Sequence, residues 1–125
     1  MEEKITSFTK LFAWQEAHKL VLMIYGATKF FPREELYGLI NQLKRASVSI
    51  SSNIAEGFSR QYYKEKIQFY YLAQGSNTEV HNQLLIARDV GYLDSENFIA
   101  LANQTVTVGK ILSGLIKKSR IIANS

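Results

Sequence analysis

The last third of the chain carries a heptad pattern that a long amphipathic helix satisfies. Its mostly apolar positions recur at steps of three and four residues: Phe98, Leu101, Thr105, Val108, Leu112 and Leu115. A helix brings such positions onto one face. The chain also has one proline and seven glycines among 125 residues. It therefore lacks the turn residues that many short strands need, and a few long helices are predicted.

Three earlier segments show the same period, and together they predict helices near 11–30, 34–57, 62–90 and 95–119. The apolar positions of the first are Trp14, Ala17, Val21, Ile24 and Thr28, and those of the second are Leu36, Leu39 or Ile40, Leu43, Ala46 or Ser47, Ile50 and Ile54. The third carries Ile67, Tyr70 or Tyr71, Ala73, Val80, Leu84 and Ala87. Pro32 separates the first two helices and suits the first turn of the second.

Glycines and small polar residues mark the predicted helix ends. Gly57 and Gly91 are expected as carboxyl caps, because glycine readily adopts the left-handed conformation there. Asp94 or Ser95 is expected to cap the fourth helix. Short connections make sequential helices antiparallel neighbours. The predicted fold is therefore all-α: one up-down-up-down four-helix bundle over residues 1–125, with flexible ends at about 1–8 and 120–125.

Composition narrows the class of protein. Apolar residues make up 46% of the chain, which is enough for a hydrophobic core. Cysteine is absent, which excludes disulfides and thiolate chemistry and fits a reducing cytoplasm. The amino-terminal sequence MEEKITSFTK has no apolar stretch of signal-peptide length, and the run Leu20–Tyr25 is too short to span a bilayer. A cytoplasmic protein without a membrane partner is expected.

The stretch SISSNIAEGF, residues 49–58, concentrates serines in a predicted helix. Part of this stretch belongs to a polar stripe that lies beside the apolar face of the helix. The stripe comprises Gln42, Arg45, Ser49, Ser52 and Glu56, and Asn53 flanks it. Small polar residues allow another backbone to approach closely, so a packing or assembly face is predicted. A serine nucleophile would need a nearby base, but His18 and His81 lie on two other helices and no Gly-x-Ser-x-Gly elbow occurs. Serine hydrolysis is therefore not expected.

The two histidines do not predict a metal site. Neither has a histidine or carboxylate at the spacing that would chelate, and Glu79 and His81 are only two residues apart, unlike the Glu-x-x-His of di-iron bundles. Both are interpreted as surface or packing residues, and no cofactor is expected.

Arg45 and Glu79 lie near the inner edges of two helices that should be antiparallel neighbours. They are expected within ion-pair distance, inside one chain or across a subunit contact, where the pair would set register more than stability. The alternative is that Arg45 reaches a bound phosphate.

The positive charge is concentrated at the carboxyl end. Residues 1–96 hold eleven basic and eleven acidic side chains, whereas residues 97–125 hold four basic and no acidic ones: Lys110, Lys117, Lys118 and Arg120. These cations either form a phosphate-seeking surface or favour the negative end of a helix dipole.

A second basic segment, RQYYKEK, interleaves cations with aromatic rings. Its candidate nucleic-acid contacts are Arg60, Tyr62, Tyr63, Lys64 and Lys66. Cations bind phosphates and aromatic rings stack on bases. Glu65 weakens the positive field, and such a sequence is also common at a solvated helix start.

Several motifs together resemble the four-helix-bundle family of 23S ribosomal RNA intervening-sequence proteins, over roughly residues 8–115. The matching residues are Trp14–Gln15, Ala17–His18, Phe31–Pro32, Glu34, Gly38–Leu39, Gln42, Arg45–Ala46, Val48–Ser49–Ile50, Ser52–Asn53–Ile54–Ala55–Glu56–Gly57, Arg60, Lys64–Glu65, Phe69, Ala73, Gly75–Ser76, Glu79 and Gln83–Leu84. The run Asn-Ile-Ala-Glu-Gly and the later Gly-Ser-x-x-Glu make the resemblance specific.

The resemblance implies an antiparallel bundle that assembles as a ring, with a homopentamer favoured, and it implies no enzymatic activity. Family members are encoded in ribosomal RNA intervening sequences or stand alone in bacterial genomes, and their function is not established. A similar fold serves as the accessory variability protein of diversity-generating retroelements, which binds nucleic acid and a reverse transcriptase. That likeness is at the level of the fold alone.

This chain departs from the family pattern at several positions. Lys44 stands where arginine is usual, which loses bidentate geometry, and Ser51 stands where proline is frequent. Lys66 replaces a common aromatic residue, which makes the loop more basic. Tyr62 replaces a capping serine, so Ser59 is expected to cap the third helix instead.

Two functional hypotheses follow. One is an oligomeric scaffold that assembles with itself and with a protein partner. The other is an accessory protein that binds RNA or DNA through its basic and aromatic residues. Salt-dependent retention on nucleic acid distinguishes them.

Overall fold

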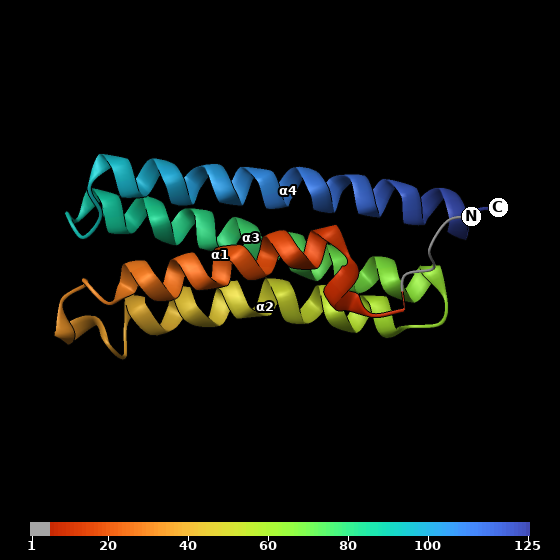
Figure 1. Ribbon diagram of the computed structural model, residues 1–125, viewed down its shortest axis with the longest axis horizontal. Coiled ribbons are helices and arrows are strands. Elements are labelled where there is room, and N and C mark those ends of the chain that lie inside the picture. Colours follow the sequence, from red (N-terminus) through yellow and green to blue (C-terminus); the bar gives the residue numbers. More distant parts are fainter. Residues whose placement is uncertain (1–5) are drawn as a thin grey trace.

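The computed structural model describes residues 6–125, which form an antiparallel bundle of four α-helices (Figure 1). The helices are α1 (Phe12–Thr28), α2 (Leu39–Ser59), α3 (Tyr63–Asp89) and α4 (Ser95–Ala123). Two single 3-10 turns precede α1 and α2: η1 (Phe8–Lys10) and η2 (Arg33–Glu35). The described residues contain no strand. The all-α bundle predicted from the heptad pattern is confirmed.

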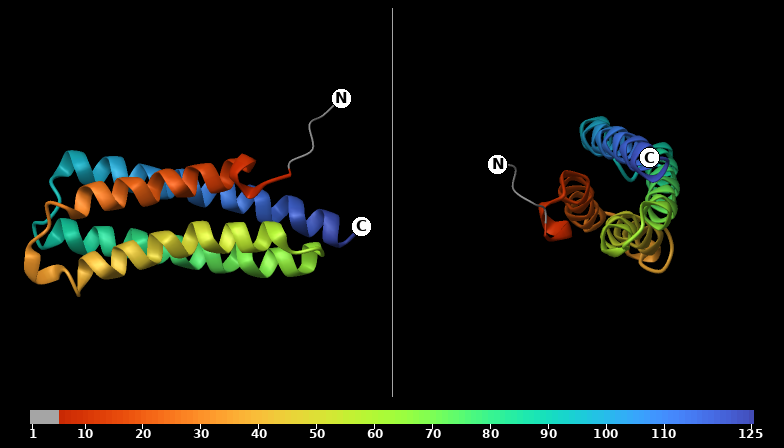
Figure 2. Two further views of the ribbon diagram at one scale, coloured as in Figure 1. Left: turned by 60° about the horizontal axis from the view of Figure 1, so that its bottom comes forward. Right: turned by 90° about the vertical axis from the view of Figure 1, so that its right-hand side faces the viewer.

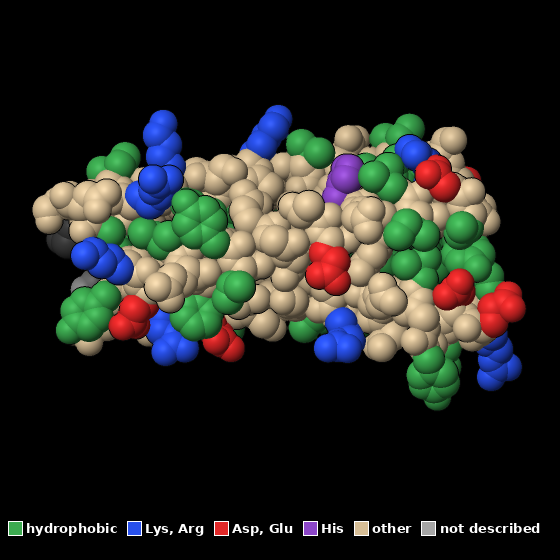
Figure 3. Space-filling view, turned by 180° about the vertical axis from the view of Figure 1, so that it is seen from behind, with side chains coloured by type: hydrophobic (Ala, Val, Ile, Leu, Met, Phe, Trp, Pro, Cys, Tyr) green, Lys and Arg blue, Asp and Glu red, His purple; other side chains and the backbone are tan. Residues whose placement is uncertain are grey.

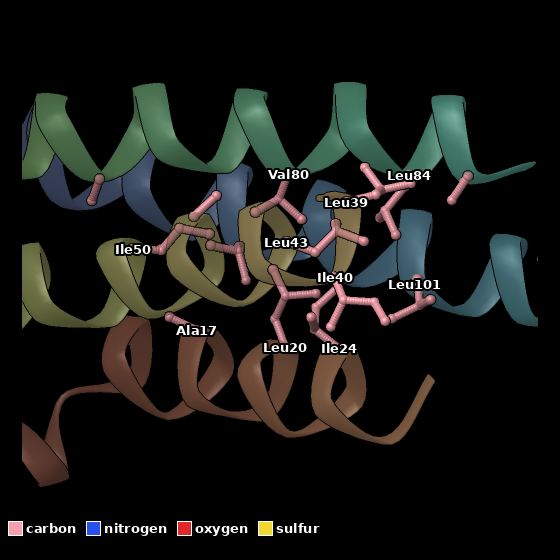
Figure 4. Packing of buried hydrophobic residues seen from close by; sticks show 14 of the residues in the cluster. Ala17, Leu20, Ile24, Leu39, Ile40, Leu43, Ile50, Val80, Leu84 and Leu101 are labelled. Carbon is pink, nitrogen blue, oxygen red and sulfur yellow. The ribbon is translucent and has the colours of Figure 1, made fainter. Parts of the chain in front are cut away.

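All four helices contribute to one hydrophobic core, as their spacing predicts (Figure 4). The labelled side chains come from each helix and meet along the bundle axis: Ala17, Leu20, Ile24, Leu39, Ile40, Leu43, Ile50, Val80, Leu84 and Leu101. Leu20, Leu43 and Leu84 are fully buried. Burial of such side chains supplies the main stabilisation of the fold.

The helices differ in length, so the bundle does not have four layers throughout. Helix α1 has 17 residues, whereas α3 has 27 and α4 has 29. The carboxyl end of α4 and the α2–α3 turn therefore extend past the start of α1 (Figure 2). At that end, α3 and α4 continue without α1 across from them.

The start of α2 lies later than predicted, at Leu39 rather than near residue 34. Residues 33–35 form only the 3-10 turn, with Pro32 before it. The side chain of Glu35 then turns back, and its Oε1 accepts a hydrogen bond from the backbone N–H of Leu39 at 3.1 Å. This carboxylate satisfies a free amide at the helix start, which explains the later boundary.

Two predicted caps are wrong. Gly57 lies inside α2, which continues to Ser59, and the glycine is buried rather than left-handed. Ser59 does not cap α3, because its hydroxyl donates to the carbonyl of Glu56 at 2.7 Å within its own helix. Tyr62 precedes α3 without a side-chain capping bond.

The connection between α3 and α4 follows the prediction. Gly91 has φ +90°, the left-handed conformation that ends α3, and Asp94 caps α4 by accepting a hydrogen bond from the N–H of Asn97 at 2.8 Å. Helix α4 extends to Ala123, so residues 120–123, expected at a flexible end, are helical. At the other end, Ser7 caps η1, and residues 1–5 lie outside the described residues.

Helix α4 carries more apolar residues than the bundle buries. Within residues 6–125 it is the one helix long and apolar enough to cross a membrane by length and composition, with an 18-residue window of mean hydropathy 1.3. Only 33% of that window is buried in the bundle. Much of the apolar surface of α4 therefore faces outward.

Candidate functional site

The serine stripe of α2 faces α3, and part of it is used inside the chain. The hydroxyl oxygens of Ser49 and Ser76 lie 2.9 Å apart, within hydrogen-bond distance. The side-chain amide of Asn53 donates to the carbonyl of Ser49 at 2.9 Å and to its hydroxyl at 3.1 Å. The Ser49–Ser76 contact joins α2 to α3, whereas the Asn53 bonds lie within α2. Ser49 and Asn53 are half-buried.

The rest of the stripe is open. Ser52 and Glu56 belong to the predicted packing or assembly face, but both are exposed within a single chain. Ser52 borders a hollow of about 450 Å³ that Tyr25, Lys44 and Val48 also line. Coverage of this region by another subunit stays a prediction.

Arg45 and Glu79 do not form the predicted ion pair within the chain. The ion pairs among residues 6–125 join Arg60 to Glu56 and Arg88 to Asp89. Arg45 and Glu79 are both exposed, and both line a polar hollow of about 290 Å³.

The carboxylate of Glu79 has a partner on its own helix, because it accepts a hydrogen bond from the side-chain amide of Gln83 at 3.2 Å. The contact that joins the two helices in this region is the one between Ser49 and Ser76, about one helical turn along the seam. The helices are neighbours as predicted, but the pair is not formed. Pairing across a subunit contact stays a prediction, as does a phosphate on Arg45.

Two cations of the RQYYKEK segment have structural partners. The guanidinium of Arg60 lies 4.5 Å from the ring centroid of Phe69, and its Nη2 lies 3.9 Å from a carboxylate oxygen of Glu56. The ammonium of Lys66 donates to the carbonyl of Phe58 at 2.6 Å, at the end of α2. Burial lowers the pKa of Lys66 from its ordinary value. Both residues therefore hold the corner between α2 and α3 together.

The other predicted contacts are free to meet a ligand. Tyr62, Tyr63 and Lys64 are exposed at the start of α3. The cations of α4 are exposed too: Lys110, Lys117, Lys118 and Arg120. In Figure 3, Lys and Arg side chains stand among hydrophobic ones toward the left end of the face, and the acidic side chains in that half lie along its lower edge.

The antiparallel arrangement brings the two basic segments to the same end of the bundle. Arg120 donates from Nη1 to the hydroxyl of Tyr71 at 3.4 Å, which joins the last turns of α4 to the early part of α3. The sequence named Tyr71 only as an alternative core position of the third helix, not as a site residue. Its signal is the spacing of seven residues from Lys64, which places both on one face of α3.

A ladder of side-chain hydrogen bonds sets the register of α3 against α4. Gln74 donates to the carbonyl of Gly109 at 3.0 Å, and Asn77 donates to the carbonyl of Thr105 at 2.9 Å. The Nδ1 of His81 lies 3.0 Å from the Thr105 hydroxyl, which itself donates to the backbone. Sequence reasoning missed this ladder, because it depends on pairing across two helices.

The histidines make packing contacts, as predicted. His18 stacks on Trp14 with ring centroids 4.6 Å apart, and His81 lies in the α3–α4 ladder. In the part of the chain that the structure describes, no three His, Asp or Glu side chains gather as metal ligands do.

Comparison with known proteins identifies the family of this chain. A solved structure of a protein of unknown function from the S23 ribosomal protein family of Bacteroides thetaiotaomicron superposes with a TM-score of 0.78 at 21% sequence identity. The match covers 84% of this chain and 98% of that one, and it shows a shared fold. No curated protein matches. The family model described as 23S rRNA-intervening sequence protein matches residues 9–114. The chain belongs to this family.

Proposed function

We propose that this protein is a non-enzymatic, self-associating helical scaffold whose copies form a ring, a homopentamer. The observation that carries the proposal is the apolar outer surface of α4, whose most apolar window is only 33% buried within the chain. The resemblance in the sequence supports the ring and its count of five.

The outer face of α4 presents branched aliphatic side chains to solvent. Ile99 is 55% exposed and Val106 is 47% exposed, and the two lie seven residues apart on the same face. Large exposed apolar patches in soluble proteins mark interaction surfaces. Burying these side chains against another copy would remove that surface from water.

A second apolar surface lies where α1 ends beside the start of α4. A hollow of about 550 Å³ opens there between Met23 and Gly26 on one side and Leu101 on the other. Phe30, at its edge, is 87% exposed. Two different apolar surfaces on one chain suit a head-to-tail contact, which closes into a ring when the rotation allows.

Sedimentation velocity and native mass spectrometry test this proposal. The expected mass is five times the 14.3 kDa of one chain. Val106→Lys places a charge on the outer face and is expected to release monomer. Asn82→Lys, which adds the same charge at an exposed position of α3, is the control and should leave the assembly intact. A parent protein that sediments as a monomer at high concentration contradicts the proposal.

A second candidate function, association with RNA or DNA, is favoured by a different observation. Residues 97–125 contain four basic side chains and no acidic one, and the basic side chains are exposed. Phosphates attract such a surface, and binding releases counterions. A scaffold and a nucleic-acid surface are compatible in one molecule.

Retention on immobilised nucleic acid at increasing salt tests the second candidate. The parent should bind at low salt and elute as salt rises. A variant in which Lys110, Lys117, Lys118 and Arg120 are all replaced by Gln should elute earlier. Failure of the parent to bind at low salt excludes this function and leaves the scaffold proposal unaffected.

A further inference from the structure

A groove follows the seam between α3 and α4 near the carboxyl end of the chain. It has a volume of about 580 Å³, within the range of small-molecule sites. Tyr71 and Gln74 line it from α3, and Lys117, Arg120 and Asn124 line it from α4. Ile116, which is buried, forms part of its apolar floor. We call this feature the α3–α4 groove.

The groove combines an accessible aromatic ring with two cations. Tyr71 is 49% exposed, so one part of its ring is open to a ligand. Arg120 contacts only the hydroxyl edge of that ring, at 3.4 Å, which leaves other guanidinium N–H groups free. Lys117 lies three residues earlier on α4, on the same side of the helix.

No acidic side chain is among the described residues that line the groove. Helix α3 has no acidic residue between Glu65 and Glu79, and the chain has none after Glu96. The positive field of Lys117 and Arg120 is therefore not cancelled within the groove. An anionic ligand is favoured over a neutral or cationic one.

The amides of the groove add hydrogen-bonding capacity. Both hydrogens of the Gln74 amide are engaged, because its nitrogen donates to the Gly109 carbonyl and to the Ser113 hydroxyl. Among the described residues, no donor is hydrogen-bonded to the side-chain oxygen of Gln74, so this oxygen can accept a hydrogen bond from a ligand. Asn124 supplies a second amide at the other end. A ligand with a flat ring, polar edges and a phosphate matches this set of groups.

We propose that the α3–α4 groove binds one nucleotide of a single-stranded nucleic acid, with the base on Tyr71 and the phosphate between Lys117 and Arg120. This inference rests on the nucleic-acid function proposed above and names its ligand and its residues. A single strand is required because a duplex hides the faces of its bases from a tyrosine ring.

Binding of a fluorescent single-stranded RNA to the full chain, followed by anisotropy over a range of salt, provides the test. Tyr71→Leu removes the stacking ring and keeps an apolar side chain. Lys117→Gln removes a cation from the groove. Lys19→Gln removes the same charge from an exposed position of α1, outside the groove, and is the matched control. The duplex of the same sequence and free uridine monophosphate serve as competing probes.

Tyr71→Leu is expected to weaken single-strand binding about tenfold, without altering the salt slope. Lys117→Gln is expected to reduce the slope by about 0.7, the contribution of one phosphate contact. Lys19→Gln should bind nearly as the parent does. Residual duplex binding should be the same in the parent and in Tyr71→Leu, and uridine monophosphate should compete only weakly.

The outcomes distinguish the groove proposal from the broader proposal of nucleic-acid binding. If the parent binds strongly but Tyr71→Leu is unchanged, or if Lys117→Gln and Lys19→Gln weaken binding equally, the charge acts diffusely and the groove proposal is wrong. Uridine monophosphate that binds as tightly as the strand would identify a free-nucleotide site instead. A parent that binds no probe at low salt overturns both proposals. Unaltered circular dichroism confirms that each variant is folded.

Discussion

Gly57 of α2 lies directly against the ring of Tyr70 of α3. A Cβ atom added at Gly57 would stand 2.7 Å from Cε1 of that ring and 3.0 Å from Cβ of Phe69. Real Cβ atoms do not approach other atoms so closely. Tyr70 is itself only 2% exposed, so its ring cannot swing away into solvent. The absence of a side chain at Gly57 therefore sets how closely α2 and α3 approach near their shared turn.

Gly57→Ala should destabilise the protein by about 1–3 kcal/mol, because the methyl group overpacks the contact with Tyr70. This cost should exceed the gain of about 1 kcal/mol that alanine brings to a helix. Gly75→Ala is the control, since a Cβ atom at Gly75 of α3 meets nothing within 4 Å. It should stabilise by about 0.5–1 kcal/mol. Urea unfolding at fixed protein concentration measures both, and a stabilised Gly57→Ala would contradict the packing argument.

The same tyrosine predicts a pH dependence. Burial, with a smaller contribution from Tyr63, raises the pKa of Tyr70 from 10.0 to about 12. Between these values the folded chain keeps a proton that the unfolded chain has lost, so stability falls as pH rises. The stabilisation from the neutral phenol is complete below pH 10 and is lost as pH passes through about 12.

Tyr70→Phe should remove the part of the alkaline loss of stability that comes from this tyrosine. Its free energy of unfolding should decline less steeply than that of the parent from pH 10 toward 12. Near pH 7 the two should have similar stability, because no hydrogen bond is assigned to the phenol. Parallel curves for the two proteins over the alkaline range would show that Tyr70 does not titrate differently on folding.

Much of the fold is predictable from the sequence because its core positions follow one local period. Leu43, Ile50 and Leu84 lie where the steps of three and four place them, and all are fully buried. The helix ends were less predictable. Gly57 has the local signature of a cap, yet its role is to admit Tyr70, which lies on another helix. The late start of α2 depends similarly on the conformation of the Glu35 side chain.

The candidate site was predictable in composition but not in geometry. The sequence identifies Lys66 and Arg120 equally well as cations. Only the structure shows that Lys66 caps the end of α2 while Arg120 reaches Tyr71, a residue 49 positions earlier in the chain. Arg45 and Glu79 lie on neighbouring helices, but their side chains do not meet. Such pairings depend on the register between helices, which periodicity alone does not specify.

Lys66 should act on stability rather than on nucleic-acid binding. Lys66→Met removes the charged donor to the Phe58 carbonyl, 2.6 Å away, and is expected to cost about 1 kcal/mol. Lys64→Met, at an exposed position one half-turn away, should change stability by less than about 0.5 kcal/mol. Thermal unfolding measures the difference. Equal effects of the two substitutions would mean that the contact with Phe58 adds nothing to the fold.

Ser52 tests whether the open part of the serine stripe is an assembly surface. Within one chain the residue is exposed beside a hollow of about 450 Å³, so Ser52→Trp has room and should fold normally. If another subunit covers this region, the indole overpacks the contact at a cost of about 1–3 kcal/mol. In a ring the cost recurs at every interface, so the whole assembly should shift toward monomer. Sedimentation of Ser52→Trp beside the parent measures this shift, with Asn82→Trp on the exposed surface of α3 as the control. An unchanged oligomer would place Ser52 in contact with water, and the interface would then lie on the two apolar surfaces proposed above, without the serine stripe.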